Sequence, residues 1–115
     1  ISYFIQMSKI YNEITIITVL YNSNEIVESF FDSLKNFKII VVDNGKNEKI
    51  LERIKNFKNI QVISKNKNLG YGRAINFAFN NISTNFFLVL NPDLSIDVSS
   101  VENMLKTLNQ YKTAE

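Results

Sequence analysis

The chain of 115 residues contains no cysteine and no histidine. The absence of cysteine excludes a disulfide scaffold, a thiolate nucleophile and a thiolate-ligated zinc or iron–sulfur centre. The absence of histidine excludes Ser–His–Asp and Cys–His catalysis and every imidazole-ligated metal site. Carboxylates, lysines, two arginines, amides and hydroxyls remain for chemistry. Any bound metal is therefore expected to be a hard, oxygen-liganded cation such as Mg²⁺ or Mn²⁺.

The chain also lacks a strong charge of either sign and a long hydrophobic run. Its 13 lysines and arginines and 11 aspartates and glutamates give a net charge of +2, which is too small to indicate a nucleic-acid-binding protein. Lysine and asparagine are spread along the chain, which we interpret as a biased coding composition. No apolar run reaches the roughly 18 residues of a membrane helix, and the opening residues lack the basic start of a signal peptide.

Short apolar runs alternate with amphipathic segments, which predicts an α/β fold with a mostly parallel sheet covered by helices on both faces. The runs rich in β-branched and aromatic residues predict strands at 14–20, 38–43, 60–63 and 85–90. The amphipathic segments predict helices at 25–35, 49–56, 70–81 and 98–111. Ser23 or Asn24 is expected to cap the first helix. Residues 14–115 form the predicted domain, and residues 1–13 precede it as an N-terminal extension.

The phenylalanines of these elements fall at core spacing. We interpret them as packing residues rather than as a platform that stacks on sugars; they are Phe30, Phe31, Phe77, Phe79, Phe86 and Phe87. In the helix at 70–81, the side chains of Ala74, Ile75, Ala78 and Phe79 are expected to face the core.

Ligands of open parallel sheets bind beyond the carboxyl ends of the strands. Asp43 ends an apolar strand there, and it is either a hydrogen-bond acceptor for a nucleotide or a former of the Asp-Asn-Gly turn. Asn91 and Asp93 flank the only proline, which directs the chain away from the sheet. Their side chains form either an oxygen site for a divalent cation on a diphosphate or a second turn.

A Gly-x-Gly sequence at Gly70 and Gly72 begins the predicted helix at 70–81. It fails as a dinucleotide fingerprint, because Ile75 stands where the third glycine belongs. The helix N-terminus still favours an anion, and Arg73 on its first turn either reaches a phosphate or is solvated surface.

Four stretches, taken together and in order, resemble the nucleotide-sugar-binding half of family 2 glycosyltransferases with the GT-A fold, especially rhamnosyltransferase-like members. The stretches are Ile16-Ile-Thr-Val-Leu-Tyr-Asn22, Ile40-Val-Val-Asp-Asn-Gly45, Asn68-Leu-Gly-Tyr-Gly-Arg-Ala-Ile-Asn76 and Phe87-Leu-Val-Leu-Asn-Pro-Asp93. The resemblance covers residues 14 to about 97. It implies a Rossmann-like GT-A half and an inverting transfer of a sugar from a UDP- or dTDP-sugar to a glycan or lipid-linked acceptor.

The resemblance also implies roles for single residues. Asp43 would read the uracil or thymine edge, and Tyr21 and Asn22 would line the base site. Asn68, Gly70 and Arg73 would lie near the ribose and diphosphate, whereas Asp93, with Asn91, would hold Mg²⁺ or Mn²⁺. It further suggests a bacterial enzyme of polysaccharide synthesis in the cytoplasm, with peripheral association at the inner face of the plasma membrane.

The sequence departs from the family pattern in three places. Asn91 replaces the usual first aspartate of the metal motif, and Lys46 and Glu48 stand where serine and aspartate are usual. The acceptor half and the catalytic base of the family would lie beyond Glu115, so no catalytic base is assigned. The alternative is a catalytically inactive nucleotide-binding or regulatory module that acts through a partner. A receiver domain is disfavoured, because no acidic pair follows the first strand.

Overall fold

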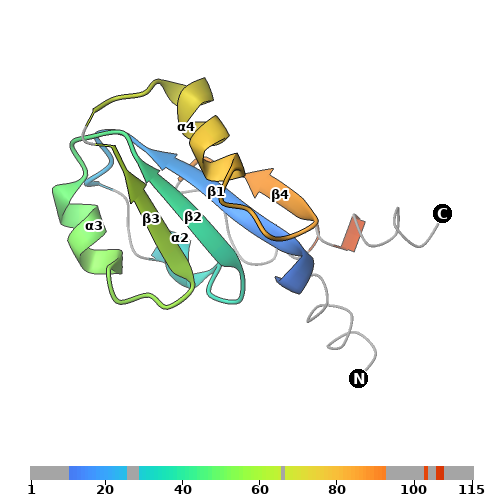
Figure 1. The fold of residues 1–115 in the computed structure, drawn as a ribbon. Helices are drawn as coiled ribbons and strands as arrows, with labels where there is room; N and C mark the ends of the chain where they lie inside the picture. Colours follow the sequence, from blue (N-terminus) through green and yellow to red (C-terminus); the bar gives the residue numbers. More distant parts are fainter. Residues whose placement is uncertain (1–10, 26–28, 66, 93–102, 104–105, 108–115) are drawn as a thin grey trace.

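The computed structural model describes residues 11–25, 29–65, 67–92, 103 and 106–107. Strands and helices alternate along the described chain, and the strands form one sheet in the order β3-β2-β1-β4 (Figure 1). The strands are β1 (Ile14–Leu20), β2 (Lys38–Asp43), β3 (Ile60–Ser64) and β4 (Phe86–Val89). The helices are α2 (Ser29–Asp32), α3 (Glu48–Ile54) and α4 (Tyr71–Phe79).

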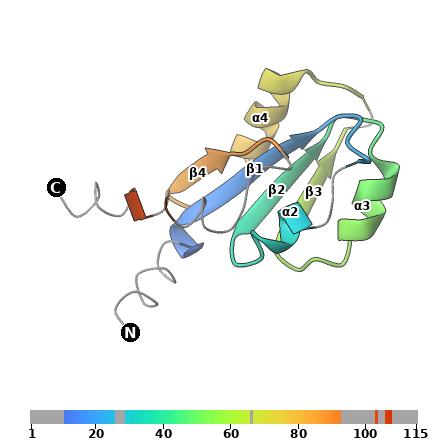
Figure 2. The same ribbon diagram turned by 180° about the vertical axis from the view of Figure 1, so that it is seen from behind.

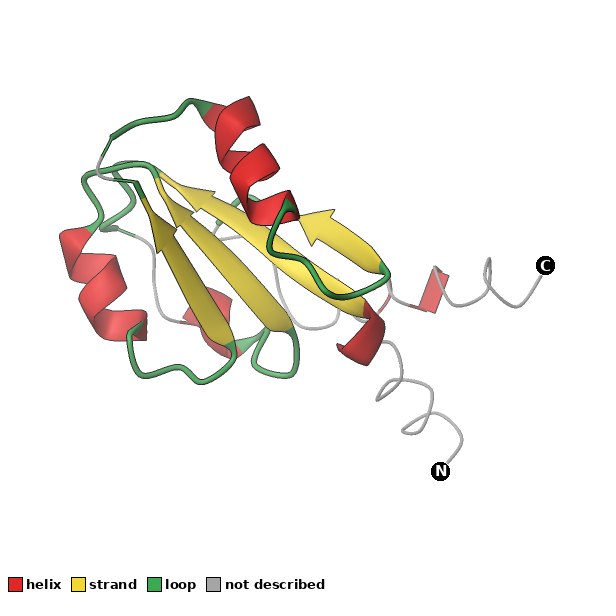
Figure 3. Ribbon diagram, viewed as in Figure 1, coloured by secondary structure: helices red, strands yellow, loops and turns green. Residues whose placement is uncertain are grey.

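Every pairing in this sheet is parallel, as the alternating sequence pattern predicts. In the registers of β1, Ile17 is opposite both Ile40 of β2 and Val89 of β4. Asp43 of β2 is opposite Leu20 of β1 on one side and Ser64 of β3 on the other. The carboxyl ends of β1, β2 and β3 therefore meet at one edge, beside the start of α3 (Figure 3).

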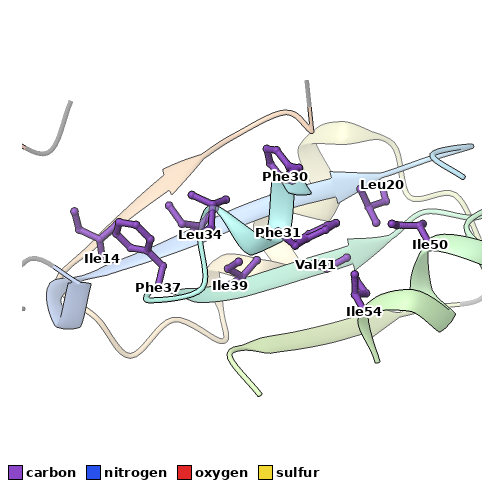
Figure 4. Packing of buried hydrophobic residues seen from close by; sticks show 11 residues of the cluster. Ile14, Leu20, Phe30, Phe31, Leu34, Phe37, Ile39, Val41, Ile50 and Ile54 are labelled. Carbon is purple, nitrogen blue, oxygen red and sulfur yellow. The ribbon is translucent and has the colours of Figure 1, made fainter. Parts of the chain in front are cut away.

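Helices cover both faces of the sheet, because the β-strand period of two sends alternate apolar side chains to opposite sides. Helices α2 and α3 cover one face (Figure 2), where Phe31, Leu34, Ile50 and Ile54 pack against residues of β1 and β2. Figure 4 shows this larger core, in which Phe31 is completely buried. Helix α4 covers the other face through Ala74 and Ala78.

The small residues of α4 allow a close approach to the sheet, and they contact a smaller core on that face. Ala74 and Ala78 are buried against Ile17, Ile40 and Val42. The spacing of the two alanines matches one helical turn, so a single narrow stripe of α4 faces the strands. The helix is thereby held over β1 and β2, with its first residue at the carboxyl edge of the sheet.

The interpretation of all six phenylalanines as core residues is wrong for three of them. Phe30 and Phe31 are buried, but Phe79, Phe86 and Phe87 are 55%, 51% and 43% exposed. Phe86 and Phe87 lie on β4, which pairs with β1 at the end of the described sheet. Phe79 ends α4, away from the alanine stripe, and its ring makes an edge-to-face contact with Phe87 at 5.5 Å between centroids. It does not face the core as predicted.

The predicted element bounds agree with the structure to within a few residues. The helix predicted at 25–35 is described from Ser29 and ends at Asp32, where tighter turns follow up to Phe37. The helix predicted at 98–111 lies largely outside the described residues. Its described positions, Asn103, Lys106 and Thr107, have helical backbone. Within the described part of the chain, no helix combines the length and apolar character needed to cross a membrane.

Candidate functional site

The loops that follow β1 and β2 are joined to each other at the carboxyl edge of the sheet. The N–H of Asn44 donates to the carbonyl of Leu20 at 2.8 Å, and the N–H of Asn22 donates to the carbonyl of Gly45 at 3.0 Å. Asn22, Gly45 and Lys46 all have positive φ angles, of 51°, 112° and 60°. The loops after β1 and β2 therefore both turn sharply at the strand ends. We call these two connected loops the rim.

The carboxylate of Asp43 lies at the centre of this rim and accepts three hydrogen bonds. Its Oδ1 accepts from the N–H of Gly45 at 2.9 Å and from Nδ2 of Asn47 at 2.6 Å. Its Oδ2 accepts from the hydroxyl of Ser64 at 3.0 Å. A carboxylate offers about four lone-pair positions. Oδ1 is therefore filled by two donors, and the remaining acceptor position belongs to Oδ2.

The polar residue Asn47 is almost completely buried in the rim, with 1% of its surface exposed. Besides its bond to Asp43, its Nδ2 donates to the carbonyl of Leu20 at 2.8 Å. Its Oδ1 accepts from the N–H of Ser23 at 2.9 Å. One side chain thus connects the end of β1, the loop after β1 and the carboxylate that ends β2.

Asn44 connects the same rim to the start of α4. Its side chain is 3% exposed, its Oδ1 accepts from the N–H of Leu69 at 3.3 Å and its Nδ2 donates to the carbonyl of Gly70 at 3.4 Å. Asn68 supports this approach, because its Oδ1 accepts from the N–H of Gly70 at 2.8 Å. Gly70 has a φ of 76°, a conformation that glycine adopts without steric cost. The predicted residues Asn68 and Gly70 therefore lie beside the turn after Asp43.

The start of α3 is capped by a residue from a different loop. Asn24 Oδ1 accepts hydrogen bonds from the N–H groups of Lys49 at 3.0 Å and Ile50 at 3.3 Å. The sequence predicts Ser23 or Asn24 as the cap of the helix after β1. The oxygen of Asn24 instead satisfies the first N–H groups of α3, since the local N-cap residue, Asn47, makes no side-chain cap bond.

A shallow cavity of about 240 Å³ lies between the end of β2, the end of β3 and the start of α3. Asp43 and Ser64 line it, together with Gly45, Asn47 and Leu51. Three charged side chains, those of Lys46, Glu48 and Lys67, complete the lining. The cavity combines two carboxylates, two ammonium groups and an apolar side chain.

The rim extends to the end of β4 through three hydrogen bonds. The hydroxyl of Thr18 donates to the carbonyl of Leu90 at 3.0 Å, and the N–H of Leu90 donates to the carbonyl of Ile17 at 2.9 Å. The hydroxyl of Tyr71 donates to Oδ1 of Asn91 at 3.2 Å. Asn91 follows β4, is exposed, and contacts Tyr71, the first residue of α4. The predicted metal ligand Asp93 lies outside the described residues.

The other predicted site residues are surface residues near the rim. Tyr21 is 44% exposed, and the ammonium of Lys46 lies 5.6 Å from the centre of its ring. Arg73 is exposed on the first turn of α4. Lys65, which directly follows β3, lies with its ammonium 4.6 Å from the ring centre of Phe77. The structure thus connects Asn22, Asp43, Asn68 and Gly70 by hydrogen bonds, whereas Arg73 belongs to the rim only by position.

Asn47 and Ser64 line the candidate site but are not predicted as site residues from the sequence. Asn47 follows the Asp-Asn-Gly turn by two positions, and its spacing of four from Asp43 is a signal that could have indicated contact across the turn. Ser64 closes β3, and the parallel register places it opposite Asp43. The sequence alone does not fix that register.

The described fold has a counterpart among solved structures. A solved structure of similar fold is the mannosyltransferase PcManGT from Pyrobaculum calidifontis in complex with GDP-Man and Mn²⁺. The TM-score is 0.59 at 16% sequence identity, over 70% of this chain and 27% of that one. This likeness supports the GT-A fold predicted from the sequence motifs.

The sequence profile described as Glycosyl transferase family 2 matches residues 15–114, and the chain belongs to this family. It is 30% identical over 108 residues to a teichoic acid poly(glycerol phosphate) polymerase of Staphylococcus epidermidis. It is 28% identical over 109 residues to the glycosyltransferase GlyA of Streptococcus pneumoniae serotype 4. These alignments cover 85% and 88% of this chain but 15% and 16% of the two relatives.

Proposed function

We propose that residues 14–115 are the donor-binding part of an inverting glycosyltransferase that takes a UDP- or dTDP-sugar. Membership of glycosyl transferase family 2 over residues 15–114 is the observation that carries this proposal. The acceptor in this proposal is a glycan or a lipid-linked molecule at the inner face of a bacterial plasma membrane. Residues 1–13 precede the domain.

Asp43 recognises the base in this proposal. Oδ2 of Asp43 carries the remaining acceptor position and lies at a cavity with Leu51 and Lys67 in its lining. Uracil and thymine present an N–H at ring position 3, whereas cytosine presents an unprotonated nitrogen there. An acceptor at Oδ2 therefore favours the first two bases. Tyr21 and Asn22, in the neighbouring loop, line the other side of the base.

The diphosphate lies between the start of α4 and the end of β4. Asn68 and Gly70 shape the start of α4, and Arg73 stands on its first turn, where a cation and the helix N-terminus both favour an anion. A phosphate at this point would leave the sugar close to the exposed side chain of Asn91.

Asn91 and Asp93 are the residues that would hold a divalent cation. Asn91 Oδ1 accepts one hydrogen bond, from Tyr71, and an amide oxygen has two lone pairs, so one is left for a cation. The described residues hold no cluster of three acidic side chains that could form a separate metal site. An oxygen-only donor set suits Mg²⁺ or Mn²⁺, and the bound cation would neutralise charge on the leaving diphosphate.

Titration of the purified chain with UDP, dTDP and GDP, with Mn²⁺, with Mg²⁺ and with EDTA, tests this function. We expect tighter binding of UDP and dTDP than of GDP, and loss of the metal-dependent part in Asp93→Ala, with unchanged far-UV circular dichroism. Binding of UDP that is indifferent both to the metal and to this substitution would contradict the metal assignment. Equal binding of GDP would contradict the base assignment.

A further inference from the structure

Asn47 occupies the N-cap position of α3 but does not cap that helix. An N-cap asparagine ordinarily accepts a hydrogen bond from the second or third N–H of its own helix. Here the N–H groups of Lys49 and Ile50 donate to Asn24 instead. The side chain of Asn47 is thereby freed to turn toward the sheet, where it is almost completely buried.

Within the described part of the chain, the Asn47 side chain bonds to the last residues of β1 and β2 and to the loop after β1. The side-chain NH₂ group of Asn47 donates to Oδ1 of Asp43 at 2.6 Å and to the carbonyl of Leu20 at 2.8 Å. The carbonyl oxygen of the side chain holds the N–H of Ser23, one residue beyond Asn22. Replacing Asn47 by another cap residue would preserve the local turn but would lose this pattern of two donors and one acceptor.

The bond to Asp43 restrains the plane of the carboxylate, and with it the direction in which its remaining lone pair faces the cavity. With Gly45 N–H and Asn47 Nδ2 both on Oδ1, that oxygen is saturated, and rotation of the carboxylate would break two hydrogen bonds. Oδ2, with one donor from Ser64, is left as the acceptor for a ligand. Without the Asn47 donor, two hydrogen bonds instead of three would hold the carboxylate plane, and its orientation would be less restrained.

We propose that Asn47 is a positioning residue for recognition of the nucleotide base. It fixes the orientation of Asp43 and ties the Tyr21–Asn22 loop to the same point, so that the two sides of the base site keep a constant separation. This inference rests on the proposed function, in which Asp43 recognises the base. Asn47 itself does not touch the ligand.

The substitution Asn47→Asp tests this role through its pH dependence. The introduced carboxyl keeps the acceptor for Ser23 but faces Asp43 Oδ1 without a donor. Two carboxyl groups at this distance share a proton as the pH falls, and the shared proton restores a donor to Asp43. We expect UDP affinity about tenfold below that of the natural chain at pH 8, and within about threefold of it at pH 5.5.

The charged groups that share the cavity, Lys46, Glu48 and Lys67, are unchanged in this variant. Because the phosphate of UDP also titrates in this range, each affinity is divided by that of the natural chain at the same pH. Asn24→Asp is the matched control, since it adds the same charge one loop away and keeps an acceptor for the N–H groups of Lys49 and Ile50. Its ratio to the natural chain should be constant from pH 5.5 to pH 8.

Asn47→Ala removes the donors without adding charge, so its loss of UDP affinity should be about fivefold at every pH. Its preference for UDP over CDP should fall by a similar factor, which a general loosening of the fold would not produce. If both variants of Asn47 fail to fold, NMR of the natural chain decides. Saturation with UDP should then shift the side-chain amide protons of Asn47 and leave those of Asn24 in place.

The inference is overturned if folded Asn47→Ala keeps the natural UDP affinity and UDP:CDP ratio, or if UDP leaves the Asn47 amide protons unshifted. The proposed function fails separately. In that case the natural chain has no preference for UDP over CDP, and Asp43→Asn changes neither affinity. If Asp43→Asn alters the preference for UDP over CDP and the Asn47 variants do not, the positioning role of Asn47 is refuted and the proposed function is kept.

Discussion

Replacing Asp43 by asparagine should reverse the preference of the cavity between uracil and cytosine. The new side chain has the same shape, but one of its two terminal atoms becomes a donor. Its orientation is determined by the surrounding groups, because the N–H of Gly45 and Nδ2 of Asn47 both donate to the Oδ1 position. An NH₂ group at that position would face these two donors and could accept from neither. The amide oxygen therefore takes the Oδ1 position, and the NH₂ group faces the cavity beside Ser64.

The magnitude follows from the hydrogen bond that is lost. A bond to a charged acceptor contributes about 1.5–3 kcal/mol, so UDP affinity should fall about 10- to 150-fold. CDP gains a donor opposite its ring nitrogen, and its affinity should rise. The fold should be kept to within about 1 kcal/mol, because Oδ1 retains its two donors and the Ser64 hydroxyl can accept in place of donating.

Isothermal titration calorimetry with UDP and CDP on the natural chain and on Asp43→Asn measures this reversal. Urea denaturation of both proteins provides the stability comparison. Ser64→Ala is a useful companion, since it removes the one donor on Oδ2 and leaves the acceptor in place. If Asp43 only forms the turn, asparagine would form it equally well. Unchanged affinities for both nucleotides would then refute its role in base recognition.

Three further predictions concern the structural support of the site. Asn24→Ala removes the acceptor for two N–H groups at the start of α3. It should lower the free energy of unfolding, measured in urea, by about 1 kcal/mol. Asn24→Asp keeps the acceptor and should not lower it. Gly45→Ala should cost about 1–3 kcal/mol through backbone strain alone, because φ is 112° and no atom lies within 4 Å of the new Cβ; a loss below 0.5 kcal/mol would be inconsistent with this turn. Phe31→Ala empties the centre of the larger core and should lower stability by about 3–5 kcal/mol in thermal or urea unfolding, well above the effect of truncating the half-exposed Phe79.

The positions of the strands along the chain could be predicted from the sequence, because fully buried parallel strands have continuous apolar runs. The runs at Ile14–Leu20 and Lys38–Asp43 coincide with β1 and β2. The aromatic residues could not be assigned in the same way. Phe86 and Phe87 have the composition of a buried strand, but exposure depends on which strand is central. That order is a property of the tertiary structure, and β4 lies at the end of the described sheet.

The location of the residues that follow the strands could also be predicted, since parallel strands end at one edge of the sheet. The hydrogen-bond partners of these residues could not be predicted from the sequence. Asn24 has the residue type and position of a cap for the next helix, yet it caps α3, which begins 24 residues later along the chain. The contact exists because β1 and β2 are adjacent and their loops meet. Tertiary proximity therefore overrides the local capping preference.

The asparagines of the rim have a structural explanation that composition conceals. The sequence indicates a coding bias toward asparagine, but Asn24, Asn44 and Asn47 each join two segments distant in the sequence. Each uses its side chain to satisfy backbone groups that strand and helix ends leave unpaired. An aspartate at any of these positions would keep the acceptor and lose the donors. Donors are essential only at Asn44 and Asn47, so these two asparagines should tolerate aspartate least.

The two interpretations of Asp43, turn former or ligand acceptor, are compatible, because the carboxylate has two oxygens in different surroundings. Oδ1 forms the turn by accepting from Gly45 N–H two residues later. Oδ2 lies between Ser64 and the cavity. The turn supplies the restraint that a recognition group needs, since a carboxylate free to rotate would lose entropy on binding. In the proposed function, forming the turn therefore prepares Oδ2 for a ligand.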